Sequence, residues 1–341
     1  MVCPPAPGSH ACAEREEGVA AAGYTRAMGR IHVGTCSWTE KTMVDLWYPK
    51  GVTSPEQRLR YYASKFDTVE VDSSYYAIPR REWAEAWVRR TPEHFVFHVK
   101  AFGLMTGHEV DVRALPPELA QFPFTEERGR VKAAHPDMVD ASFDMFLDSI
   151  EPLHAAGKLG GILMQFPPYF AATTPEHEKR GLEYLEYVAA QLKGYRTLVE
   201  FRHPSWVDDH HLDSTLAFLS ERDLSYVSVD SPQFPSHSTM PPVAVATNRW
   251  AYVRFHGRNA DTWYKHGGTA ADRFDYLYSA EELAEWVAPI RQLAENADEV
   301  FVMFNNNRYD YAQRNAAEIA TILGDDVVAP EAPSGETQRL F

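Results

Sequence analysis

Cysteine is scarce in this chain, since only Cys3, Cys12 and Cys36 occur among 341 residues. Three cysteines make neither a disulfide scaffold nor a zinc-ligand array, so we expect a reducing, cytoplasmic compartment. No apolar run approaches the roughly 20 residues that a membrane-spanning helix needs. Basic residues are also few, with 33 Lys and Arg against 48 Asp and Glu and a net charge of -15. This balance argues against a broad nucleic-acid-binding face and leaves a local basic pocket for a small anionic substrate as an option.

Both ends of the chain lack the periodicity of a helix or strand. Residues 1–29 are rich in Ala, Gly and Pro and do not have the pattern of a signal peptide. We expect a disordered extension there, or a true start at Met28. Residues 324–341 are acidic and contain proline, which predicts a flexible tail. Between them, residues 30–323 show no change in composition and are expected to form one domain.

Eight short apolar segments alternate with helical patterns along this domain. The expected strands are 31–38, 68–76, 94–100, 159–167, 197–203, 225–230, 251–257 and 300–306. The expected helices are 55–64, 82–90, 137–156, 176–191, 208–221, 279–296 and 311–323. Strands that alternate with helices pair in parallel, and eight such units close into a (β/α)8 TIM barrel, an α/β fold. A long insertion, residues 101–136, follows the third strand.

Charged and polar residues occupy one alternating face near the C-terminal ends of these strands. Glu200 and Arg202, for example, alternate with Val199 and Phe201, and side chains of a strand point to opposite faces in turn. An apolar outer face and a charged inner face predict a polar chamber at the C-terminal mouth of the barrel. The residues on the inner phase are Glu70, Asp72, Ser74, His98, Lys100, Gln165, Glu200, Arg202, Asp230, Arg254, His256, Asn305 and Asn307. Cys36 falls on the helix-facing phase, where packing is the expected role.

The inner residues suggest chemical roles. Lys100, Arg202 and Arg254 are suited to bind a phosphate or carboxylate. Candidate catalytic residues are Glu200, Asp230 and Glu70 as general bases and His256 as general acid or proton shuttle. Further substrate-binding candidates are Asp72, Gln165, Asn305 and Asn307, with Trp38 and Tyr75 as aromatic rings that can stack on a base or sugar.

Two other interpretations of these residues remain open. The acidic and basic groups can form a structural network of buried ion pairs, and His256 can be a core histidine. Alternatively, a divalent metal can be held by a subset of Glu70, Asp72, His98, His108, Glu200, His203, Asp230 and His256. HxH and HExxH spacings are lacking, and the interleaved cations would repel a metal ion, so we assign no metal ligand and no cofactor.

Several motifs resemble a known family. They are GTCSW (34–38), WYP (47–49), YYASKFDTVEVDSSYYAIP (61–79), HFVFHVKAF (94–102), KLGGILMQFPP (158–168), VEFRHPSW (199–206), YVRFHG (252–257) and VFVMFNNN (300–307). Together they resemble the YecE/YunF-like TIM-barrel family, known as domain of unknown function 72. The resemblance implies a barrel with a site at its mouth, but no reaction, because the family has no assigned activity. The sequence departs from the family at Cys36-Ser37, where Ser-Gly is usual, and in its longer insertion.

The leading functional hypothesis is a cytoplasmic enzyme, a hydrolase that acts on an anionic, phosphorylated substrate by general acid/base chemistry. The alternatives are a metal-dependent, endonuclease IV-like nucleic-acid phosphodiesterase and a non-catalytic ligand- or partner-binding barrel. Residues 104–124 are expected to form a mobile lid over the mouth. At the C-terminus, Gln338, Leu340 and Phe341 resemble a short peptide that binds a sliding clamp, although a solvated tail is the simpler interpretation.

Overall fold

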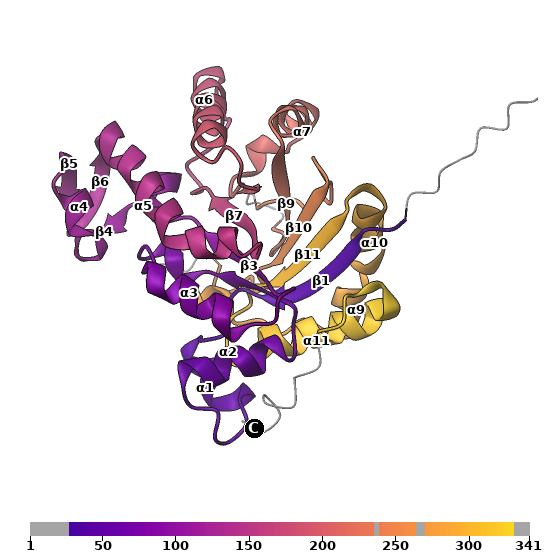
Figure 1. The fold of residues 1–341 in the computed structure, drawn as a ribbon. Coiled ribbons are helices and arrows are strands. Elements are labelled where there is room, and N and C mark those ends of the chain that lie inside the picture. The colour runs from indigo at the N-terminus through magenta and orange to yellow at the C-terminus, as the bar shows by residue number, and fades with distance from the viewer. Residues whose placement is uncertain (1–26, 235–238, 264–269, 331–341) are drawn as a thin grey trace, which may run out of the picture.

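A closed barrel of eight parallel strands forms the centre of the molecule (Figure 1). The computed structural model describes residues 27–234, 239–263 and 270–330. Around the barrel the strand order is β1-β11-β10-β9-β8-β7-β3-β2. The strands are β1 (Arg30–Thr35), β2 (Thr68–Val71), β3 (Val96–Lys100), β7 (Leu159–Gln165), β8 (Thr197–Glu200), β9 (Leu224–Asp230), β10 (Trp250–Phe255) and β11 (Glu299–Phe304). The predicted TIM-barrel fold is confirmed, and each strand overlaps its expected segment.

Helices cover the outside of the barrel. They are α1 (Lys41–Trp47), α2 (Pro55–Ala63), α3 (Arg81–Arg90), α5 (Pro136–Ala155), α6 (Pro175–Gln191), α7 (Leu212–Glu221), α8 (Ala270–Arg273), α9 (Ala280–Ala284), α10 (Val287–Asn296) and α11 (Tyr311–Leu323). Ser54 and Gln57 form a capping box at the start of α2, as is favourable for a helix N-terminus. The single helix expected at 279–296 is wrong, because the chain breaks between α9 and α10, where Trp286 turns its indole toward the barrel.

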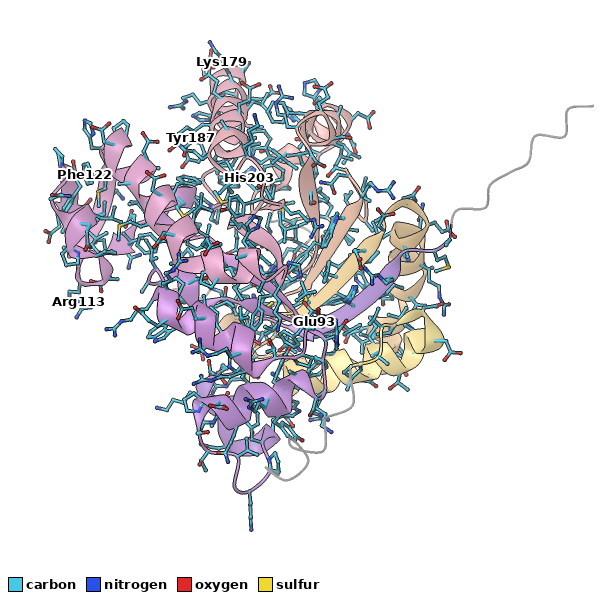
Figure 2. All side chains as sticks on the ribbon, viewed as in Figure 1. Glu93, Arg113, Phe122, Lys179, Tyr187 and His203 are labelled. Atoms are coloured by element: carbon cyan, nitrogen blue, oxygen red, sulfur yellow. The ribbon has the colours of Figure 1, made fainter. Side chains whose placement is uncertain are left out.

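The insertion after β3 forms a small sheet of its own. Strands β4 (Val110–Asp111), β6 (Arg130–Ala134) and β5 (Phe124–Glu127) pair antiparallel, with the short helix α4 (Pro117–Ala120) beside them. This unit projects outside the ring next to α5, and Figure 2 shows Arg113 and Phe122 on it, far from the barrel axis. Its first turn, the 3-10 helix Gly103–Thr106, is buried in the core, which contradicts a lid that begins at Leu104.

Residues 324–330 pack against the barrel. Val327 bridges to Ile31, and the amide of Val328 donates to the carbonyl of Ile31 at 2.8 Å. These contacts place residues 324–330 against the barrel, and the flexibility of the tail stays a prediction. Residues 1–26 and 331–341, and with them Gln338, Leu340 and Phe341, lie outside the described residues. No helix in the described part of the chain is long and apolar enough to cross a membrane.

Candidate functional site

A column of buried charges fills the barrel beneath its C-terminal mouth. The guanidinium of Arg254 on β10 donates from Nη1 to Oε2 of Glu200 at 2.5 Å and from Nη2 to Oε1 of Glu70 at 2.6 Å. The hydroxyl of Tyr252 donates to the other oxygen of Glu70 at 2.9 Å. All four side chains are completely buried. The strand alternation that placed Glu70, Glu200 and Arg254 inside the barrel is therefore correct.

Glu200 is the acceptor shared by the strands around it. Its Oε1 accepts hydrogen bonds from Nε2 of Gln165 at 2.7 Å, Nη1 of Arg202 at 3.0 Å and Nε2 of His256 at 3.0 Å. Burial alone would raise the pKa of Glu200, but Arg254, His256 and Arg202 outweigh it and hold that pKa well below its usual range. Glu200 is therefore a carboxylate whose two oxygens already accept four hydrogen bonds.

His256 is held in one tautomer by two asparagines. Nδ2 of Asn307 donates to Oδ1 of Asn305 at 3.0 Å, which orients the Asn305 amide so that its Nδ2 donates to Nδ1 of His256 at 2.9 Å. The ring proton then lies on Nε2 and is donated to Glu200. Burial lowers the pKa of His256 to about 4, despite the opposing charge of Glu200. At neutral pH His256 is a neutral donor.

Glu70 and Asp72, two residues apart on β2 and the turn after it, respond differently to their surroundings. Burial raises the pKa of Glu70, although Arg254 opposes this. Burial also acts to raise the pKa of Asp72, but Lys100 and Arg254 outweigh it and lower that pKa. The ammonium of Lys100 lies 2.8 Å from Oδ1 of Asp72 and 4.5 Å from the centre of the Tyr75 ring. Asp72 is one quarter exposed, so this pair faces the open mouth.

Above the buried column the mouth opens as a cavity of about 520 Å³. Its lining residues are Cys36, Ser37, Thr39, Glu40, Asp72, Ser73, Tyr75, Tyr76, Lys100, His108, Gln165, Phe166, Pro168, Arg202, Arg273, Phe274, Asn305 and Asn307. Arg202 donates from Nη1 to Glu200 at 3.0 Å, and the same nitrogen lies 3.1 Å from Nε2 of His256. Nε and Nη2 of Arg202 have no hydrogen-bond partner among residues 27–234, 239–263 and 270–330. The arrangement fixes one edge of the guanidinium and leaves the other available to a ligand.

His108 faces this cavity, although we assigned it only to a possible metal site. The Thr106 hydroxyl donates to the Gly103 carbonyl at 3.1 Å, so its oxygen accepts from Nδ1 of His108 at 2.8 Å. Nε2 of His108 therefore carries the lone pair. Burial together with the charges of Lys100, Arg202 and Arg130 lowers the pKa of His108 to about 4. No strand alternation could reveal this residue, because it lies in the insertion.

The structure corrects the placement of four residues. Asp230 shares its register with Phe255 and faces the helices, where it accepts from Trp286 at 2.7 Å, Tyr278 at 2.6 Å and Arg258. Trp38 also lies under the helices, against Trp87 and Phe97.

Arg254 lies below the cavity with both terminal nitrogens bound, so it does not contact a ligand in the mouth. Cys36 was predicted to face the helices, but it faces the barrel interior, with its sulfur 3.8 Å from Nη2 of Arg254.

The metal alternative has no donor set to support it. Within the described ranges, no three His, Cys, Asp or Glu side chains are grouped so that they could hold a metal ion. His203 faces away from the barrel interior and contacts Ser205, and His98 lies deeper than the mouth, against Tyr252 and Phe301. Glu70 and Glu200 are already bound to Arg254.

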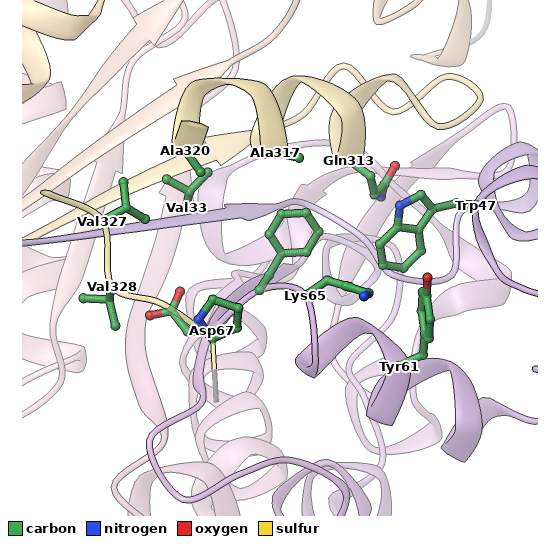
Figure 3. Close-up of a pocket in the computed structure, with 12 residues that line it drawn as sticks. Val33, Trp47, Tyr61, Lys65, Asp67, Gln313, Ala317, Ala320, Val327 and Val328 are labelled. Atoms are coloured by element: carbon green, nitrogen blue, oxygen red, sulfur yellow. The ribbon is translucent and has the colours of Figure 1, made fainter. Parts of the chain in front are cut away.

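Another hollow lies on the side of the barrel, between β1, α2 and α11 (Figure 3). Its walls are mostly apolar and include Trp47, Phe66 and Val327, with Lys65, Asp67 and Gln313 among the polar exceptions. It contains none of the groups that converge at the mouth. The mouth cavity is therefore the candidate functional site.

Comparison with known proteins identifies the family. A family model described as "Protein of unknown function DUF72" matches residues 32–338. The UPF0759 protein YunF of Bacillus subtilis (strain 168) is 32% identical over 297 residues, which are 86% of this chain and 94% of YunF. A DUF72 family protein from Enterococcus faecalis V583 is 29% identical with a TM-score of 0.69, and covers 86% of this chain and 95% of its own. Another from Thermotoga maritima MSB8 is 30% identical with a TM-score of 0.67, over 86% and 99% of the two chains. The chain belongs to the DUF72 family.

Proposed function

We propose that the protein is an enzyme that hydrolyses a phosphorylated substrate at the C-terminal mouth of the barrel by general acid/base chemistry. The observation that carries the proposal is that two cationic donors and a neutral base face one cavity. Lys100 and the unbound edge of Arg202 face the same cavity as the lone pair of His108. A cationic cavity of about 520 Å³ in a chain with a net charge of -15 selects for an anion of small-molecule size.

The buried column supports this site indirectly. Glu200 and Glu70 neutralise Arg254, and Glu200 also fixes Arg202 and Gln165 from below. A carboxylate with four donors and a depressed pKa is a poor proton acceptor. We therefore assign Glu200, Glu70 and His256 as positioning residues and transfer the role of general base to His108.

The proposed reaction needs three steps from this chain's own groups. Arg202 and Lys100 bind the phosphate oxygens and reduce their negative charge. Nε2 of His108 takes a proton from a water molecule as the water oxygen bonds to phosphorus. The ester oxygen leaves as its bond to phosphorus breaks, and it receives a proton from the ammonium of Lys100. The bound phosphate also offsets the cations that depress the pKa of His108, so the base becomes competent only when substrate is present.

The test combines binding and turnover. Isothermal titration with inorganic phosphate should give an affinity that falls about 10- to 100-fold in Arg202→Met. Arg291→Met is the matched control, because Arg291 pairs with Asp326 far from the mouth. Release of phosphate from a panel of phosphate esters should fall about 10²- to 10⁴-fold in His108→Gln. It should be unchanged in His177→Gln, which alters an exposed histidine on α6.

Two outcomes would contradict the proposal in different ways. Phosphate binding that depends on Arg202 without turnover of any ester would favour a non-catalytic binding barrel. Binding that is equal in wild type and Arg202→Met would show that the mouth is not an anion site.

A further inference from the structure

A chain of hydrogen bonds leads from buried Glu200 to the wall of the mouth cavity, and every bond in it runs in a fixed direction. Glu200 is a carboxylate and only accepts, so His256 donates to it from Nε2 and keeps a lone pair on Nδ1. Asn305 must then donate from Nδ2 to Nδ1, and its Oδ1 accepts from Nδ2 of Asn307 at 3.0 Å. Oδ1 of Asn307, at the end of the chain, is therefore held as an acceptor.

This terminal oxygen faces the cavity. Asn307 lines the cavity, and its Oδ1 is neither buried nor bonded to a partner among the described residues. The amide cannot turn over to offer its NH2 group, because the direction of the whole chain is set by the charge of Glu200. A ligand that covers Asn307 must bring a donor, since an unmade hydrogen bond is costly.

Two carboxylates add further acceptors to the cavity wall. Oδ1 of Asp72 is buried and lies 2.8 Å from the ammonium of Lys100, so the exposed quarter of this side chain includes Oδ2. Oε2 of Glu40 accepts from the backbone amides of Thr42 at 2.6 Å and Met43 at 2.9 Å. Oδ2 of Asp72 and Oε1 of Glu40 have no partner in the part of the chain that the structure describes. Lys100 beside Asp72 would repel an ammonium group, so neutral hydroxyl donors suit these oxygens better.

The order of the strands separates the acceptors from the cations. Asn307 follows β11, Glu40 follows β1 and Asp72 follows β2, and these three strands are neighbours in the barrel. Lys100 ends β3, the next strand, and Arg202 follows β8, two strands further along. A phosphate bound by Lys100 and Arg202 therefore directs the remainder of its ester toward the arc of acceptors.

An exposed aromatic ring completes this arc. Tyr75 and Tyr76 line the cavity just after Asp72, and their rings contact edge to face with centroids 5.0 Å apart. Tyr76 is 59% exposed. An aromatic face beside hydrogen-bond acceptors is complementary to a sugar, which has C–H groups on the faces of its ring and hydroxyl groups around the edge.

We propose that the substrate of the mouth is a sugar phosphate, whose hydroxyl groups donate to Asn307, Asp72 and Glu40 and whose ring lies against Tyr76. This inference rests on the proposed function and names the class of alcohol that the phosphate esterifies. The cavity of about 520 Å³ is within the size range of small-molecule sites and extends over both arcs. The cations bind the phosphate, and the acceptors select the sugar.

The test compares esters that differ only in their hydroxyl groups. Isothermal titration uses His108→Gln, so that the esters stay intact, with ribose-5-phosphate and glucose-6-phosphate as ligands. Pentyl phosphate and hexyl phosphate are the matched esters without hydroxyl groups. We expect at least one sugar phosphate to bind about 10-fold more tightly than its alkyl counterpart, because a site built for hydroxyl groups discriminates against a ligand that lacks them.

Glu40→Gln is the diagnostic variant. Its amide oxygen replaces Oε2, where Thr42 and Met43 donate, so the NH2 group takes the place of Oε1 and presents a donor to the ligand. Affinity for the sugar phosphate should fall about 10-fold, whereas affinity for the alkyl ester and for inorganic phosphate should stay within about twofold. Asn307→Leu should give the same split. Asn296→Leu is the matched control, an exposed asparagine at the end of α10, where the chain enters the opposite end of the barrel.

The outcomes separate this inference from the proposed function. Equal affinities for the sugar and alkyl esters, with inorganic phosphate still bound through Arg202, would overturn the sugar and leave phosphate ester hydrolysis in place. A preference for sugar phosphates that is unchanged in both Glu40→Gln and Asn307→Leu would also overturn it, since the acceptors would then lie elsewhere. If neither the esters nor inorganic phosphate binds, the proposed function is wrong and this inference falls with it.

Discussion

The two ends of the barrel hold cavities of similar volume, about 520 Å³ at the C-terminal mouth and about 570 Å³ at the N-terminal end. Both are supported by buried ion pairs, but the pairs are built from different partners. At the mouth, Glu200 and Glu70 hold Arg254, a cation that cannot lose its charge. At the N-terminal end, Asp67 and Glu299 hold His32, which can deprotonate.

Because of this difference, the two ends should respond differently to the loss of a carboxylate. Removing one carboxylate from a buried arginine leaves an uncompensated charge, whereas a histidine in the same situation releases its proton and becomes neutral. The charge of Arg254 below the mouth is therefore fixed, whereas the charge of His32 at the N-terminal end depends on pH.

Glu200→Gln tests this contrast with the largest expected effect. The change leaves Arg254 with Glu70 alone and removes the charge that holds Arg202, so we expect a loss of about 3–5 kcal/mol in the free energy of unfolding. Asp67→Asn at the other end should cost only about 1–2 kcal/mol at pH 7, because His32 keeps Glu299 and can titrate. Urea denaturation of both variants measures the difference. Equal losses at the two ends would remove the distinction, and an unchanged stability in Glu200→Gln would show that the column is not structural.

The pH dependence of stability should come from the N-terminal end. Burial opposes protonation of His32, but the hydrogen bonds to Asp67 and Glu299 outweigh burial and raise its pKa to about 9. A raised folded-state pKa contributes stability that is complete below the unfolded value near 6.5 and is lost as pH rises through about 9. The shift corresponds to about 3 kcal/mol. Urea midpoints between pH 6 and 10 should fall accordingly in wild type.

His32→Gln is the variant that isolates this effect. It should flatten the alkaline part of the stability profile while the midpoint at pH 9.5 stays close to that of wild type. A profile that falls equally steeply in His32→Gln would assign the alkaline loss to another group.

At the mouth, we expect the pKa of His108 to change when a ligand binds. Burial and the charges of Lys100, Arg202 and Arg130 hold the pKa of His108 near 4, and phosphate bound near Lys100 and Arg202 offsets two of these charges. We expect this pKa to rise by at least about 1 unit on saturation with phosphate. The measurement is an NMR titration of His108 with and without phosphate. A pKa that stays near 4 at saturation would place the anion away from His108 and remove it as the base.

The sequence predicted the barrel and most of its inner residues because strand alternation has a period of exactly two residues, which holds wherever the strand is regular. Glu70, Lys100, Glu200, Arg254, His256 and Asn305 all face the interior as expected. The errors at Asp230 and Cys36 are errors of phase at strand ends, where the alternation itself continues. Asp230 is the last residue of β9 and pairs with Phe255, so its register follows the outer phase. Cys36 follows the end of β1, where we had assigned the phase from the wrong neighbours.

Strand alternation does not predict how deep in the barrel an inward-facing side chain lies. Arg202 and Arg254 share the inner face, yet one reaches the cavity and the other is completely buried below it. His108 was missed for another reason, since an insertion has no repeat from which its direction can be derived. Its position depends on the packing of residues 103–106 against the barrel and on the hydrogen bond to Thr106. Both are tertiary contacts that leave no local pattern in the sequence.

Asn305→Ala should have the smallest effect on stability, and it tests what orients His256 below the mouth. Asn305 contributes one hydrogen bond to His256 and accepts one from Asn307, so its loss should cost about 1 kcal/mol in stability. The informative readout is the tautomer of His256, from its ¹⁵N shifts. In wild type the proton lies on Nε2, toward Glu200, and Asn305→Ala removes the donor that keeps Nδ1 unprotonated. If Glu200 alone is sufficient to hold the proton on Nε2, the tautomer will not change. A mixed tautomer with unchanged stability would instead show that the asparagine pair orients His256 without contributing to the fold, the behaviour of a positioning residue.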